Sequence, residues 1–140
     1  MEMELLNEVV QSKYNLENCL KLSHWVSNGR DFYQYHALFA NLYDIASQGT
    51  DELVELGIAF GYSPDFNTFG GVMATLEDRS CQNLLRVSAN MLTTYMAKLF
   101  ELRSQLQEKP MAIGLVAHIE ELASYATRIL YQVSAAMEKE

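Results

Sequence analysis

The sequence predicts an all-α protein that forms a four-helix bundle with a long crossover between helices two and three. Apolar residues recur at helical spacing in four long segments, and no alternating pattern typical of a strand competes with them. The connections between these segments are short, long and short. Short connections make consecutive helices antiparallel neighbours, whereas a long connection allows the chain to cross the bundle.

A short break at Asn28-Gly29 separates the first two helical segments. Residues 3–27 form the first predicted helix, and an Asn-Gly pair ends it because glycine tolerates the left-handed backbone that often follows a helix. The second helix is expected over residues 31–60, with Asp31 as its N-cap. Gly49 and Gly57 weaken this helix locally, and a Gly-Tyr-Ser-Pro stretch stops it.

The second half of the chain begins with the longest connection, residues 62–79, in which the piece VMATLED is compatible with a short helical turn. The third helix is expected from about residue 81 to 107 and the fourth from about 112 to 137, with Lys-Pro between them. Four helices of about 25 to 30 residues with these connections match the ferritin-like bundle. We expect residues 1–140 to form one such domain.

Composition and charge restrict the class of function. No apolar run reaches the roughly 18 residues that cross a bilayer, and the acidic start of the chain lacks the basic region of a secretory signal. Cys19 and Cys81 lie far apart without a CxxC motif, which is typical of reduced thiols in a cytoplasmic protein. The net charge of −8, without a basic tail, repels nucleic-acid phosphates and suits the accumulation of cations.

Four polar residues at the first two helices form a candidate metal site. His24 ends the first helix and His36 lies near the start of the second, whereas Asp51 and Glu55 share one face of the second helix. His36 and Asp51 are 15 residues apart, or roughly 22 Å along a continuous helix, so one chain cannot bring them together. A two-fold axis would instead place the histidines of one chain opposite the carboxylates of its partner. These ligand types suit Fe(II) and similar ions.

The same residues have an ordinary structural explanation. A histidine at a helix end is usually a cap or a hydrogen-bonded polar group, and an Asp–Glu pair four residues apart usually lies in solvent. Spacing alone favours this explanation. His118 and Glu121, three residues apart, form a pair that can hold a second ion, but a histidine at the edge of the bundle is the more common outcome.

The longer pattern around the candidate site resembles the Dps family of mini-ferritins. Over residues 16–64 the sequence combines HWxxxGxxFxxxH with LYD, DELVE and GYSP. In that family this pattern builds a ferroxidase centre between two-fold-related subunits. The iron ligands that the resemblance implies are His24, His36, Asp51 and Glu55, with Trp25 beside the centre. A conventional ferritin site is not expected, because no histidine here has a glutamate three residues before it.

The resemblance implies an enzyme that binds iron as a mono-iron or di-iron centre, oxidises Fe(II) with hydrogen peroxide or dioxygen and stores Fe(III), which limits oxidative damage. It also implies a homo-oligomer, in which the dimer completes the site and a dodecameric cage follows. The second half departs from the family, since residues 110–114 replace its Gly-Asp-x-x-Thr stretch and the segment before the third helix is shorter. One alternative is therefore a catalytically inactive structural or assembly protein. Another, a DNA-condensing protein, is disfavoured by the charge.

Overall fold

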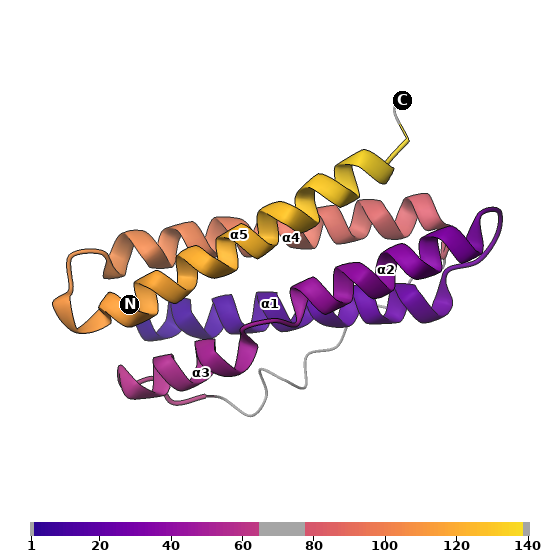
Figure 1. Ribbon diagram of the computed structural model, residues 1–140. Coiled ribbons are helices and arrows are strands. Elements are labelled where there is room, and N and C mark those ends of the chain that lie inside the picture. The colour runs from indigo at the N-terminus through magenta and orange to yellow at the C-terminus, as the bar shows by residue number, and fades with distance from the viewer. Residues whose placement is uncertain (1, 65–77, 139–140) are drawn as a thin grey trace.

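The structure is a computed structural model that describes residues 2–64 and 78–138. It confirms the all-α four-helix bundle (Figure 1). Within the described residues the only β pairing is one isolated bridge between Asn28 and Ser80. The helical turn expected in VMATLED lies outside the described residues, apart from Asp78, which is not helical. The described helices are α1 (Glu2–Val26), α2 (Phe32–Ala46), α3 (Thr50–Ala59), α4 (Cys81–Leu106), the short 3-10 helix η2 (Pro110–Ala112) and α5 (Ile113–Ala136).

The direction of the helices requires the predicted crossover. Lys98 Nζ of α4 lies 3.7 Å from Glu8 Oε1 of α1, and Ser80 pairs with Asn28 at the other end of the same two helices, so α1 and α4 are antiparallel. The end of α1 meets the start of α2, and Lys13 in the middle of α1 contacts Ala46 at the end of α2, so these two helices are also antiparallel. Helices α2 and α4 therefore run parallel, and only a connection along the length of the bundle can join them.

The core consists of the apolar stripes of the long helices and of α3. Leucine dominates it, with Leu20, Leu42, Leu53 and Leu102 each fully buried on a different helix. Each such side chain contributes about 1.5–3 kcal/mol to folding relative to an exposed one. None of the described helices is long and apolar enough to span a membrane.

The single helix predicted over residues 31–60 is wrong, because the chain breaks it into α2 and α3 (Figure 1). Gly49 lies in the break with φ +82°, in the left-handed region that disfavours side chains. A Cβ atom at Gly49 would lie 2.7 Å from Leu122 Cδ2 and 3.1 Å from His118 Cε1 of α5. Glycine at this position therefore permits both the turn and the close packing of α5.

The cap of α2 also differs from the expectation. Asp31 does occupy the N-cap position, but its φ is 66° and its side chain makes no capping hydrogen bond. At α4, by contrast, the Ser80 hydroxyl accepts a hydrogen bond from the Asn83 backbone N–H at 3.4 Å. The start of α2 is thus held by its tertiary contacts and not by a side-chain cap.

We expect Gly49→Ala to lower the free energy of unfolding by about 1–3 kcal/mol, because the new methyl group meets Leu122 and the backbone is strained. Urea denaturation of the purified protein measures this change. Gly114→Ala is the matched control, since a Cβ there meets nothing within 4 Å. It should leave stability unchanged or raise it by up to about 1 kcal/mol. Equal effects of the two substitutions would contradict the role given to Gly49.

Candidate metal centre

His24 and His36 lie together where the chain turns from α1 into α2. Their rings stack with centroids 3.8 Å apart and an angle of 15° between the planes. His24 Nδ1 lies 2.8 Å from the carbonyl oxygen of His36, and His36 Nδ1 lies 2.6 Å from the carbonyl oxygen of His24. Phe32 stacks on His36 from α2, with centroids 5.0 Å apart. The two histidines predicted to share a site are therefore neighbours.

These hydrogen bonds determine which ring nitrogen of each histidine carries the proton. A carbonyl oxygen only accepts, so Nδ1 must donate in both rings. In the neutral ring Nε2 then keeps its lone pair. Histidines that bind metals commonly donate their other N–H to a backbone carbonyl in this way. Both side chains are partly buried, and their donor set fits a divalent ion that prefers nitrogen and oxygen ligands.

Asp51 and Glu55 lie one turn apart on α3, and both are exposed. The estimate that separated Asp51 from His36 assumed a continuous helix, and the break between α2 and α3 removes that assumption. Asp51 and Glu55 nevertheless do not meet the histidines of their own chain. Among residues 2–64 and 78–138 of one chain, no group of three or more His, Cys, Asp or Glu residues is arranged to hold a metal ion. Neither carboxylate therefore joins the histidines within one chain.

Trp25 is 58% exposed beside the histidine pair. The Lys21 ammonium lies 5.2 Å from the centre of a Trp25 ring and 5.5 Å from that of Tyr43, within the range of a cation–π interaction. Leu22 of α1 and Ile58 of α3 are exposed as well. Leu22 and Trp25 lie on the same helix as His24, whereas Ile58 lies on α3 with Asp51 and Glu55.

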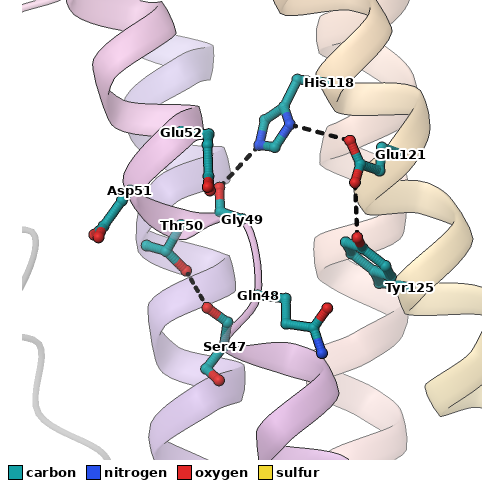
Figure 2. A pocket seen from close by; sticks show the side chains of 9 residues that line it. All are labelled: Ser47, Gln48, Gly49, Thr50, Asp51, Glu52, His118, Glu121 and Tyr125. Carbon is teal, nitrogen blue, oxygen red and sulfur yellow. Dashed lines mark hydrogen bonds and ion pairs between the residues drawn. The ribbon is translucent and has the colours of Figure 1, made fainter.

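A pocket of about 470 Å³ opens between the α2–α3 break and α5 (Figure 2). His118 is buried there, and its Nε2 donates to the Gly49 carbonyl oxygen at 2.9 Å. Its Nδ1 lies 3.7 Å from Glu121 Oε2, while Glu121 Oε1 accepts a hydrogen bond from the Tyr125 hydroxyl at 2.7 Å and raises the pKa of Tyr125. The His118–Glu121 pair has no third metal ligand among the described residues. Through its hydrogen bond to Gly49, His118 links α5 to the break between α2 and α3.

A buried ion pair was not identified from the sequence. Lys13 and Glu17 of α1 are both buried, and the Lys13 ammonium lies 2.7 Å from Glu17 Oε1. Lys13 also donates to the Ala46 carbonyl and to the Thr50 hydroxyl, at 2.6 Å each. The pair therefore contacts the end of α2 and the start of α3, directly before Asp51.

The sequence did contain a signal for this pair. Val9 and Leu16 lie four residues before and three residues after Lys13, and both are buried. Lys13 thus occupies the apolar stripe of α1, and Glu17 follows it one turn later on the same face. A lysine inside an apolar stripe, with an acidic residue four positions later, therefore marks a candidate ion pair, but this spacing does not by itself show that the pair is buried.

No family model matches the sequence, and no curated protein matches it. A search of solved structures does find a similar one, a mutant of Dps1 from Mycobacterium smegmatis. The likeness covers 98% of this chain and 95% of the Dps1 chain, with a TM-score of 0.79 and 16% sequence identity. It shows a Dps-like fold, and at this identity the chemistry must be argued from the residues of the present chain.

The hydrogen bonds predict opposite tautomers for two kinds of histidine in this chain. In the neutral form, His24 and His36 should carry the proton on Nδ1, whereas His118 should carry it on Nε2 because Nε2 faces the Gly49 carbonyl. Long-range proton–nitrogen correlation spectra of histidine-labelled protein distinguish the two forms. His118 serves as the internal control. Protonated Nε2 on neutral His24 or His36 would contradict the proposed ligand atoms.

Proposed function

We propose that this protein is a ferroxidase of the mini-ferritin type, with Fe(II) as its substrate at a site between two-fold-related subunits. The observation that carries this proposal is the reciprocal pairing of His24 and His36, in which each Nδ1 donates to the backbone carbonyl of the other residue. The pairing fixes both rings, whose centroids lie 3.8 Å apart, and leaves a lone pair on each Nε2. A metal-binding histidine commonly has this form, in which its other ring N–H donates to a backbone carbonyl.

The partner subunit supplies the carboxylates in this proposal. Asp51 and Glu55 are exposed and lie apart from the histidines of their own chain, so a second copy must approach for the four residues to meet. A two-fold axis makes the arrangement reciprocal and gives two sites in each dimer. The exposed side chains of Leu22 and Trp25 on α1 and of Ile58 on α3 leave apolar surface that such an interface would cover.

The chemistry follows from the charge of the ligands. Two neutral imidazoles bind Fe(II), and the Asp51 and Glu55 carboxylates offset the positive charge. They attract Fe(III) more strongly than Fe(II), which favours the loss of an electron. Two Fe(II) ions and two protons reduce one hydrogen peroxide molecule to two water molecules. Dioxygen is the second candidate oxidant. The net charge of −8 favours the approach of cations, and Fe(III) would be retained in the interior of a homo-oligomer built on the Dps-like fold, as a dodecameric cage would provide.

We expect Asp51→Asn/Glu55→Gln to reduce the anaerobic oxidation of Fe(II) by hydrogen peroxide to the rate in buffer, because the neutral amides no longer favour Fe(III). The rate is followed by the absorbance of Fe(III) in protein of confirmed oligomeric state. Glu4→Gln/Glu8→Gln is the matched control, since it removes two exposed carboxylates with the same spacing on α1. A wild-type rate no higher than buffer would refute the proposal and favour the inactive structural or assembly protein.

Mixed dimers test the position of the site between subunits. One chain carries His24→Ala/His36→Ala and the other carries Asp51→Asn/Glu55→Gln, and each alone should be inactive. In random co-assembly half of the dimers are mixed, and each mixed dimer has one intact site, so activity should return to about a quarter of the wild-type value. Recovery measured on co-expressed, co-purified protein supports a shared site. No recovery, with mixed dimers shown by mass spectrometry, would contradict it.

A further inference from the structure

The polar clamp, which we define as Lys13, Glu17 and Thr50, lies inside the bundle at the break between α2 and α3. The Lys13 side chain is 2% exposed, and its three N–H donors have three acceptors: Glu17 Oε1, the Ala46 carbonyl and the Thr50 hydroxyl. The Thr50 hydroxyl donates in turn to Glu17. Lys13 and Glu17 are therefore hydrogen-bonded and buried, whereas Thr50 is half-buried and also lines the pocket of Figure 2.

The clamp is a poor source of net stability. Burial lowers the pKa of Lys13, and the nearby Glu17 carboxylate only opposes that effect. Replacement of a buried ion pair by apolar residues of similar volume is often neutral or stabilising. The main effect of the clamp is therefore to orient the groups that it contacts, the Ala46 carbonyl and the Thr50 hydroxyl.

The clamp joins the two helices on either side of the break. Ala46 is the last residue of α2, where the final carbonyl groups lack donors from their own helix, and Thr50 is the first residue of α3. One ammonium group contacts both. From the opposite side, His118 donates to the Gly49 carbonyl (Figure 2). The direction in which α3 leaves the break is thus set by contacts from α1 and α5.

Helix α3 depends on these contacts more than the long helices do. It has 10 residues, fewer than an isolated helix needs to be stable in water. Asp51 directly follows Thr50, and Glu55 lies one turn further on. A change in the direction or order of the first turn of α3 therefore moves both carboxylates together.

We propose that Lys13 and Glu17 are positioning residues, which fix the direction of α3 and thereby place Asp51 and Glu55 opposite the histidines of the partner subunit. The second half of this inference rests on the proposed ferroxidase function. The first half, that the ion pair orders α3, stands on the hydrogen bonds of the clamp alone.

The test uses the full-length homo-oligomer with the double substitution Lys13→Met/Glu17→Leu, which removes both charges together and keeps the volume similar. Hydrogen exchange should show the amides of residues 53–56, the first in α3 with acceptors inside the helix, exchanging about tenfold faster than in the wild type. Global stability in urea should change little, because the gain from burying apolar side chains is opposed by the loss of the donor to the Ala46 carbonyl. Ser88→Ala is the matched control, since it removes a buried polar contact between Cys19 and Ser88 on α1 and α4 and should leave α3 exchange unchanged.

The second measurement is Fe(II) binding under anaerobic conditions. The apparent affinity should fall about 10–100-fold in the double variant, as for the loss of groups that orient metal ligands. Unchanged exchange in α3 would overturn the positioning role. Faster exchange with unchanged Fe(II) affinity would overturn its link to Asp51 and Glu55.

Two further outcomes are distinguishable. If the wild type neither binds nor oxidises Fe(II), the proposed function fails, while the exchange measurement still decides whether the clamp orders α3. If the double variant does not fold, Thr50→Val decides the question, because it removes only the α3 end of the clamp and preserves the side-chain shape. Thr50→Val should accelerate exchange of the amides of residues 53–56, and wild-type exchange in that variant would overturn the proposal.

Discussion

The break at Gly49 is the constraint that places α3, and with it Asp51 and Glu55. Its positive φ turns the chain between α2 and α3, and the missing side chain lets Leu122 and His118 of α5 pack against the backbone. The break also leaves backbone carbonyl groups at the end of α2 without donors from their own helix. Lys13 of α1 donates to the Ala46 carbonyl, and His118 of α5 donates to the Gly49 carbonyl.

The candidate metal centre lies at the opposite end of α2 and follows a different principle. There, backbone groups orient side chains, because the carbonyl oxygens of His24 and His36 each accept a hydrogen bond from the ring of the other residue. Two rigid imidazoles with defined tautomers result, but two nitrogen ligands alone do not complete an iron site. In the proposed function the remaining ligands are Asp51 and Glu55 of a two-fold-related subunit, and both residues are exposed on α3.

Charge is used in two different ways in this chain. The exposed acidic residues contribute to the net charge of −8 and act at a distance on cations in solution. The buried charges of Lys13 and Glu17 instead form short hydrogen bonds with each other and with groups at the break between α2 and α3. Desolvation makes such a pair costly, so its contribution is to geometry more than to stability.

The sequence by itself determined the helical fold, the crossover and the ends of the long helices, because apolar periodicity and stop signals such as Asn28-Gly29 act locally. It also marked His24, His36, Asp51 and Glu55 as candidates by residue type and spacing, and their assignment as iron ligands remains a prediction. Only the tertiary structure decided that residues 31–60 form two helices, since the break at Gly49 depends on contacts from α5. Likewise, only the packing of α1 against the break showed that Lys13 is buried, because neighbours distant in sequence supply its acceptors.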